Sequence, residues 1–175
     1  TEEKIMKELA SFGQRAERLP AWQLEPVVLE INKLLASIIG IQKFSVAGSF
    51  RRVSETSKDV DFIIATEQHE VVREAILSKL VILEVVAAGD TKISLILDRE
   101  EPVSVDFRLV KLAEYATALH HFTGSKDHNI RMRQLAKDQG KKISEYGVEQ
   151  EDGTMVTFET EEAFFAHFDL PFIPP

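Results

Sequence analysis

Apolar residues recur along the first 110 positions at two spacings, one typical of helices and one typical of strands. The helical spacing predicts helices over Glu2–Phe12 and Trp22–Ile39, with Pro20 between them and Gly40 as the C-cap of the second. Short β-type runs follow at Lys43–Ala47, Val60–Ala65, Lys92–Leu97 and Val103–Val110. A further helix, Glu67–Leu80, is predicted between the second and third of these strands. This order predicts a mixed α/β module behind a helical lead-in.

The pattern changes after Val110 to shorter elements. Two helices are predicted, Leu112–Phe122 and Ser125–Gln139, because the apolar spacing is interrupted by Gly124. Two strands, Lys142–Tyr146 and Met155–Phe158, are predicted around a turn at 151–153, and a short helix follows from residue 160. We therefore predict an α+β fold in three parts: a helical lead-in over residues 1–40, a mixed sheet over 41–110, and a smaller α+β module over 111–175.

Charge is distributed unevenly along the 175 residues, whose formal net charge is −8. Residues 111–147 hold seven basic and four acidic side chains, whereas residues 148–175 hold seven acidic side chains and no Lys or Arg. A polyanion can therefore still dock on one face of an acidic protein. We expect the acidic segment 148–175 to be solvated surface only.

Two other features of composition narrow the class of protein. The chain has no cysteine, which excludes disulfides, thiol nucleophiles and cysteine-ligated zinc. No apolar run approaches the roughly 20 residues that span a bilayer, and the first residues lack the pattern of a signal peptide. We therefore expect a soluble, cytoplasmic protein with no membrane partner.

Three aspartates stand on predicted strands with apolar neighbours. Asp59 and Asp61 are two residues apart, so their side chains share one face of the strand about 6.6–6.8 Å apart. Asp106 stands in a second run of the same kind, and three carboxylates converge if the two strands pair. Adjacent carboxylates repel each other unless a cation lies between them, and oxygen ligands suit magnesium. Such a set can hold two magnesium ions roughly 3.5–4 Å apart, as in phosphoryl transfer.

A glycine and a serine come directly after the first β-type run. The backbone can approach a ligand closely at Gly48, and the Ser49 hydroxyl can donate to a phosphate oxygen. Arg52 adds a positive charge and a bidentate fork of donors. An ordinary strand-to-helix turn is the alternative interpretation of Gly48-Ser49 alone, but the nearby carboxylates favour a phosphate site.

These motifs together resemble the family X DNA polymerases, within the nucleotidyltransferase superfamily. The resemblance rests on Gly48-Ser49-Phe50-Arg51-Arg52, Asp59-Val60-Asp61, Val105-Asp106-Phe107-Arg108, Phe122-Thr123-Gly124-Ser125 with Asn129 and Arg133, and Ile143-Ser144-Glu145-Tyr146-Gly147. It implies that residues 1–40 are the end of the fingers, that 41–110 form a nucleotidyltransferase-type palm, and that 111–175 form the thumb.

The resemblance also implies a role for each matching residue. Asp59, Asp61 and Asp106 would be the catalytic, metal-binding carboxylates for two Mg²⁺ ions, with Mn²⁺ as a substitute. The nucleotide-binding set would be Gly48, Ser49, Arg52, Phe122, Gly124 and Asn129. The DNA-binding set would be Arg133, Lys141 and Lys142. The chain departs from the family at Lys58, where a glycine is common.

The function that follows from the resemblance is template-directed DNA synthesis in gap-filling repair. The expected partners are gapped or primer-template DNA and a deoxynucleoside triphosphate. One alternative is a nucleotidyltransferase with an acceptor other than DNA. Another is a DNA- or nucleotide-binding fragment whose activity is negligible without flanking domains.

Four further residues have competing interpretations. The histidines at 120, 121 and 128 are not spaced to complete a zinc site, so we do not expect one. Arg108 shares a strand face with Asp106; it is either part of a structural ion pair or a switch that pairs with Asp61 or Asp106 before metal binds.

Overall fold

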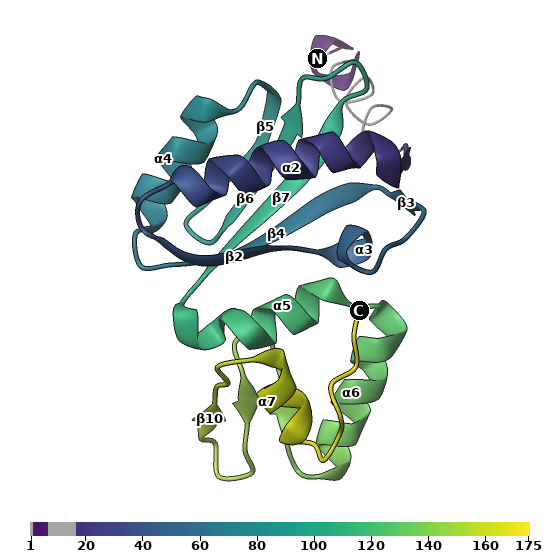
Figure 1. Cartoon of the computed structure of the whole chain (residues 1–175), viewed down its shortest axis with the longest axis vertical. Coiled ribbons are helices and arrows are strands. Elements are labelled where there is room, and N and C mark those ends of the chain that lie inside the picture. Colours follow the sequence, from purple (N-terminus) through teal and green to yellow (C-terminus); the bar gives the residue numbers. More distant parts are fainter. Residues whose placement is uncertain (1, 7–16) are drawn as a thin grey trace.

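The computed structural model describes residues 2–6 and 17–175 (Figure 1). Residues 2–6 are helical, and residues 7–12 of the helix predicted there lie outside the described residues. The rest forms two parts, which we call the sheet region (residues 19–110) and the C-terminal region (residues 111–175). No helix within the described ranges is long and apolar enough to cross a membrane.

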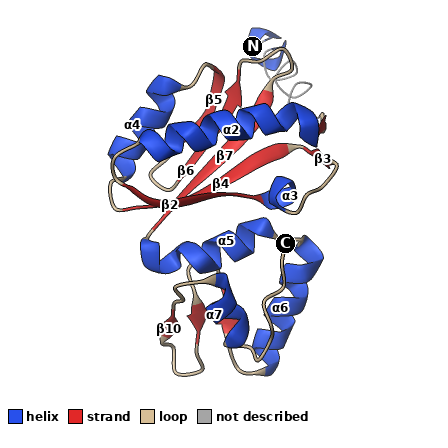
Figure 2. Ribbon diagram, in the orientation of Figure 1, coloured by secondary structure: helices blue, strands red, loops and turns tan. Residues whose placement is uncertain are grey.

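The sheet region is built on one mixed sheet (Figure 2). Its strands, in spatial order, are β2 (Ile41–Ala47), β4 (Asp59–Thr66), β7 (Val103–Val110), β6 (Lys92–Leu97) and β5 (Ile82–Ala88). Strands β4 and β7 are parallel, and the other neighbours are antiparallel. The remaining elements of this region are α2 (Ala21–Ser37), α3 (Gly48–Arg51), α4 (His69–Lys79), β1 (Leu19–Pro20) and β3 (Thr56–Ser57). Because parallel strands need a crossover, the chain between β4 and β7 passes through α4 and the β5–β6 hairpin.

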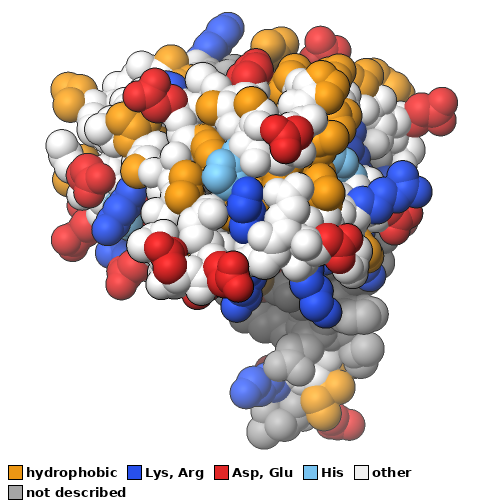
Figure 3. All heavy atoms as spheres, turned by 90° about the horizontal axis from the view of Figure 1, so that it is seen from below, with side chains coloured by type: hydrophobic (Ala, Val, Ile, Leu, Met, Phe, Trp, Pro, Cys, Tyr) orange, Lys and Arg blue, Asp and Glu red, His pale blue; other side chains and the backbone are white. Residues whose placement is uncertain are grey.

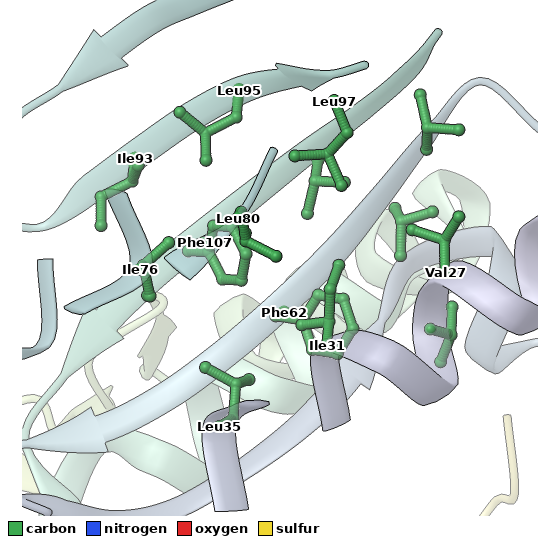
Figure 4. Packing of buried hydrophobic residues seen from close by; sticks show 14 of the residues in the cluster. Val27, Ile31, Leu35, Phe62, Ile76, Leu80, Ile93, Leu95, Leu97 and Phe107 are labelled. Carbon is green, nitrogen blue, oxygen red and sulfur yellow. The ribbon is translucent and has the colours of Figure 1, made fainter. Parts of the chain in front are cut away.

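The alternating side chains of β4 separate two faces of the sheet. Val60, Phe62 and Ile64 point to the face that α2 and α4 cover, where they join the largest hydrophobic cluster of the described residues. Phe62 stacks there on Phe107, with ring centroids 5.6 Å apart (Figure 4). Ile63 points to the opposite face and packs with a separate cluster. Since side chains alternate along a strand, the aspartates of β4 lie on this second face.

The C-terminal region lies against that second face of the sheet. Its elements are a 3₁₀ turn (Leu112–Glu114), α5 (Tyr115–Thr123), α6 (Lys126–Asp138), β8 (Lys142–Ile143), β9 (Val148–Glu149), β10 (Met155–Val156) and α7 (Glu161–Ala166). Helix α5 packs on the sheet through Ala118 and Leu119, which meet Ile63. A second core, rich in phenylalanine, joins α6, α7 and the short strands.

The predicted α+β class with a mixed sheet is confirmed, and several element boundaries are wrong. Strand β5 was not predicted because its pattern is not one-sided: its apolar side chains at Leu83, Val85 and Val86 are exposed, and its register with β6 shifts twice. Helix α2 ends at Ser37 with Ile38 as its cap, so Gly40 is not the C-cap.

The C-terminal region differs more from the prediction. The expected helix over Leu112–Phe122 is a 3₁₀ turn followed by α5. The strand predicted over Lys142–Tyr146 ends at Ile143, because the Ser144 amide donates to the carbonyl of Gly147 and closes a turn. The strand predicted over Met155–Phe158 stops at Val156.

Candidate functional site

An open cleft of about 400 Å³ lies where the sheet edge meets the junction of α5 and α6. It is lined by Arg18, Gly48, Ser49, Arg52, Lys58, Asp59, Asp61, His121, Phe122, Thr123, Gly124, Lys126 and Asn129. The cleft therefore gathers all six residues predicted to bind nucleotide, together with two of the three predicted carboxylates. The lining does not include Asp106 or the residues predicted to bind DNA.

The pairing of β4 with β7 brings the three carboxylates to the same face of the sheet. In the parallel register, Asp61 lies opposite Asp106 and Asp59 lies opposite Ser104. Burial, followed by the charges of Asp106 and Asp59, raises the pKa of Asp61 to about 6. Burial and then Asp106 raise the pKa of Asp59 as well. The three groups therefore repel one another in the folded chain.

Positive charge near these carboxylates compensates only part of this repulsion. Lys92 Nζ lies 4.0 Å from Asp106 Oδ2, at the outer limit of an ion pair, and both side chains are partly exposed. Arg108 lowers the pKa of Asp61, but its guanidinium lies over the ring of Phe122, 4.4 Å from the centroid. The predicted pairing of Arg108 with Asp61 or Asp106 is therefore not the arrangement of this structure, in which the cation faces an aromatic ring.

The chemistry of the carboxylates fits a divalent cation, although their side chains are not closed around one. All three offer oxygen ligands, and their mutual repulsion would be relieved by positive charge. In residues 2–6 and 17–175, however, no group of three or more His, Asp or Glu side chains is arranged to hold a metal ion. The strand register thus brings the three aspartates together as expected, but their carboxylates do not converge on one point.

The turn after β2 brings backbone close to Asp61. Gly48 has φ +63°, and a Cβ at this position would collide with the Asp61 carboxylate. A glycine is therefore required both by the backbone conformation and by the available space. The neighbouring Ser49 hydroxyl donates its hydrogen to Ser57 Oγ at 2.7 Å. In this structure the hydroxyl that we predicted to donate to a phosphate therefore donates to another side chain.

Two adjacent arginines of this turn tie the sheet region to the C-terminal region. Arg52 Nη1 donates to the carbonyl of Thr123 at 2.5 Å, and a Cβ at Gly124 would lie 3.1 Å from the same nitrogen. Arg51 donates to both carboxylate oxygens of Glu161, at 2.6 and 3.0 Å, and to Thr123 Oγ1 at 2.8 Å. The backbone at the end of α5 is therefore held within reach of the turn.

The position of Glu161 contradicts our expectation that the acidic segment 148–175 is solvated surface only. Its side chain is only 12% exposed because Arg51 pairs with it across the two regions. The sequence shows Glu161 merely as one acid at the start of a short helix, and no local signal marks its partner 110 residues away. Tertiary packing alone reveals this pair.

The junction of α5 and α6 positions Asn129 beside the cleft. The side-chain nitrogen of Asn129 donates to the carbonyl of His121 at 2.7 Å. His121 Nε2 lies 3.7 Å from Glu145 Oε2, while burial lowers the pKa of the His121 imidazole. Arg133 follows Asn129 by one helical turn and is exposed, so the two side chains belong to one side of α6.

The two lysines predicted to contact DNA differ in their surroundings. Lys141 Nζ lies 5.4 Å from the centroid of the Phe168 ring and donates to Gln139 at 3.2 Å. Lys142 is exposed. On the face of the C-terminal region seen in Figure 3, acidic and basic side chains are interspersed. The positive charge of residues 111–147 therefore does not form an uninterrupted patch on this face.

Sequence reasoning missed the role of one histidine pair. His120 is 4% exposed, and its Nε2 lies 2.9 Å from His128 Nε2. Burial, followed by the nearby His128, lowers the pKa of His120 to about 3, so the imidazole is neutral. The rings of Phe164 and Phe165 surround it, with centroids 4.4 and 5.3 Å away. Three histidines within nine residues were the available signal, and the structure uses two of them as a hydrogen-bonded pair, with His120 buried and His128 half-buried.

Comparison with known proteins relates this chain to DNA polymerases. The family model described as DNA polymerase beta thumb matches residues 118–175. The protein named DNA polymerase/3′-5′ exonuclease PolX from Bacillus subtilis (strain 168) is 52% identical over 176 residues, which cover 100% of this chain and 31% of that protein. The chain thus spans less than a third of the length of this relative. Because the match includes the sheet region as well as the thumb, the chain belongs to the family X DNA polymerases.

Proposed function

We propose that the chain carries the nucleotidyl-transfer centre of a DNA polymerase, which adds a deoxynucleotide to the 3′-hydroxyl of a primer. The observation that carries the proposal is the parallel register that sets Asp61 opposite Asp106 beside the cleft containing Gly48 and Arg52. In the reaction the primer oxygen bonds to the α-phosphorus, and the bond to the β-phosphate breaks. Pyrophosphate leaves, and the hydroxyl proton passes to water.

In this proposal the three carboxylates bind the metal ions. Asp59, Asp61 and Asp106 would hold two Mg²⁺ ions, for which Mn²⁺ is a substitute. When bound, the ions stabilise charge on the attacking and leaving oxygens. Burial, followed by the charges of Asp106 and Asp59, raises the pKa of Asp61 to about 6, and a cation bound among these carboxylates would offset both effects.

The contacts to the phosphates and the sugar of the nucleotide are assigned to residues of two turns, the one after β2 and the one between α5 and α6. Arg52 uses one of its five N–H donors on Thr123, which leaves others for the β- and γ-phosphates. The closeness of the Gly48 backbone to Asp61 supports a phosphate contact beside the metal-binding carboxylates. Phe122 and Gly124, on the opposite wall of the cleft, would lie against the deoxyribose.

The helix after this turn would read the DNA. Asn129 lines the cleft and would meet the minor-groove edge of the incoming base, and Arg133 would meet the template strand. Lys141 and Lys142 would contact DNA phosphates. The match of residues 118–175 to a polymerase thumb supports DNA, over any other acceptor, as the partner of this helix. The role in gap-filling repair and the cytoplasmic location stay predictions.

Single-nucleotide incorporation on a one-nucleotide gap, with Mg²⁺, tests the proposal. We expect wild-type chain to extend the primer and Asp106→Ala to lose at least about 1,000-fold in the single-turnover rate, which corresponds to about 4 kcal/mol of transition-state stabilisation. Thermal stability of the variant should be equal or higher, because Asp106 raises the pKa of Asp59 and Asp61. Asp98→Ala is the matched control, since Asp98 is an exposed aspartate at the far end of the β6–β7 hairpin.

The outcomes separate the three candidate functions. Wild-type-like rates for Asp106→Ala would contradict the assignment of the carboxylates. Transfer of a nucleotide to a small hydroxyl acceptor, without primer extension, would favour the alternative nucleotidyltransferase. Binding of DNA or nucleotide without any turnover would leave the chain as a binding fragment.

A further inference from the structure

A second, much smaller cavity lies between α5 and α6, behind the cleft wall. Its volume is about 10 Å³, at the lower limit of what a cavity needs to hold one water molecule. It is lined by His120, His121, Asn129, Met132, Arg133 and Ile143. His121 and Asn129 line both this cavity and the cleft, so these two side chains separate the cavity from the cleft.

Two polar atoms of the residues around this cavity lack a partner within the protein. They are His120 Nδ1 and Asn129 Oδ1, both buried. Leaving such an atom unpaired destabilises the folded state, and buried polar groups are therefore nearly always satisfied. The other polar atoms of these side chains are already engaged: His120 Nε2 with His128, and the Asn129 nitrogen with the His121 carbonyl.

One water molecule satisfies both atoms whichever tautomer the histidine pair adopts. If His120 accepts from His128, its Nδ1 carries the proton and donates to the water, which then donates to Asn129 Oδ1. If His120 donates to His128, the water donates to both Nδ1 and Oδ1. A protein side chain in this place would need to be both donor and acceptor, and a water molecule has this ability.

We propose that one buried water bridges His120 Nδ1 and Asn129 Oδ1, and that His120 is thereby a positioning residue for the Asn129 amide. The bridge holds Oδ1 toward the protein. It therefore leaves the second hydrogen of the Asn129 nitrogen available to the cleft, the first being donated to His121. Minor-groove edges of all bases present an acceptor at this place, purine N3 or pyrimidine O2, so the orientation suits any correct base.

The consequence for the nucleotide rests on the proposed function, whereas the water bridge itself does not. The neutral state of His120 is consistent with both arrangements of the water, in each of which one of its ring nitrogens carries a proton and the other does not. The ring of His120 is also held in place by Phe164 and Phe165, so its Nδ1 has a fixed direction. His128 holds the other ring nitrogen of His120, Nε2, at 2.9 Å.

Two substitutions of His120 separate the bridge from general packing. The side-chain amide of His120→Asn lies as far from Cβ as Nδ1 does, so it can still bond to the water while losing His128. The amide of His120→Gln lies as far from Cβ as Nε2, so it can still bond to His128 while losing the water. Both variants put a polar, smaller side chain into the same core position, so each controls for the other's loss of packing.

Steady-state extension of primer-template DNA measures the effect on the nucleotide. We expect His120→Gln to raise the KM for the deoxynucleotide about 5- to 10-fold, the value of one oriented hydrogen bond, with little change in kcat. His120→Asn should stay within about twofold of wild type. Equal KM values for the two variants would overturn the positioning role.

A direct measurement on the wild-type chain tests the water without any activity. Nuclear Overhauser contacts from a long-lived water to the Asn129 amide protons are expected in wild type and in His120→Asn, and are expected to be lost in His120→Gln. Absence of this contact in wild type would overturn the bridge. If the contact is present and the chain does not extend primers, the proposed polymerase function fails while the bridge stands.

Discussion

The sheet region and the C-terminal region of this chain are stabilised by different means. In the sheet region, strands of six to eight residues form long hydrogen-bonded ladders over an aliphatic core, with Phe62 and Phe107 at its centre. In the C-terminal region, the strands are two residues long, and the core is a cluster of rings around His120. The first region is specified mainly by backbone pairing, and the second by contacts between individual side chains.

Removing one ring from each core tests this difference most strongly. Phe107→Ala and Phe165→Ala should each cost about 3–5 kcal/mol, because both side chains are nearly fully buried. Phe107→Ala should lower amide protection throughout the chain, since the C-terminal region packs on the sheet. Phe165→Ala should lower protection only after Val110. Hydrogen exchange measured residue by residue checks this, and equal loss in the sheet region of both variants would contradict two separable cores.

The two regions should respond to acid with opposite signs. The pKa of Asp61 is raised to about 6, so the folded chain binds more protons than the unfolded chain between about pH 6 and 4, and this group favours folding as the pH falls. The pKa of His120 is lowered to about 3, so the unfolded chain binds more protons between about pH 6.5 and 3, and this group favours unfolding as the pH falls. Over its whole pH range, the effect of Asp61 is on the order of 3 kcal/mol and that of His120 on the order of 5 kcal/mol.

Unfolding by denaturant at pH 7 and pH 4.5 measures both effects. Relative to wild type, Asp61→Asn should make the chain lose more stability between these two pH values, and His120→Phe should make it lose less. Variants that shift the pH dependence in the same direction would show that one of the two burial effects is absent.

The contact between the regions should contribute less than either core. Arg51 and Glu161 form a two-bond pair with both side chains less than a fifth exposed. A double-mutant cycle of Arg51→Ala and Glu161→Ala should give a coupling of about 1–3 kcal/mol in the free energy of unfolding. In the pair Arg99–Glu30 a single guanidinium nitrogen donates to both carboxylate oxygens, and the side chains are more exposed, so this pair should couple by less than about 1 kcal/mol. Similar coupling for both pairs would mean that burial of the first pair adds nothing.

The smallest expected effect concerns DNA phosphates. Lys141→Ala and Lys142→Ala should each weaken binding to all DNA sequences alike and reduce the salt dependence of binding by about one unit of slope. Lys79→Ala is the matched control, because Lys79 is an exposed lysine on α4, in the sheet region. A slope that is unchanged by Lys142→Ala would exclude this lysine from the DNA interface.

The difference between the regions also explains how well each could be predicted. The helix spacing of α2 and the strand runs of β4, β6 and β7 are regular, because each element has a buried face that dictates the pattern. The two-residue strands of the C-terminal region have no such pattern, and their ends depend on turns such as the one from Ser144 to Gly147. Strand β5 was missed for a related reason, since its apolar side chains face solvent.

The sequence by itself determined which residues could do chemistry. The spacing of Asp59 and Asp61 places both on one strand face, and the Gly48–Arg52 motif supplies a close backbone and a cation, all of which are local properties. Only the tertiary structure decided which distant groups meet. The register that sets Asp61 against Asp106, the pairing of Arg51 with Glu161, and the contact of His120 with His128 each join separate elements. Local patterns carry no information about such contacts, because they follow from the packing of whole elements against one another.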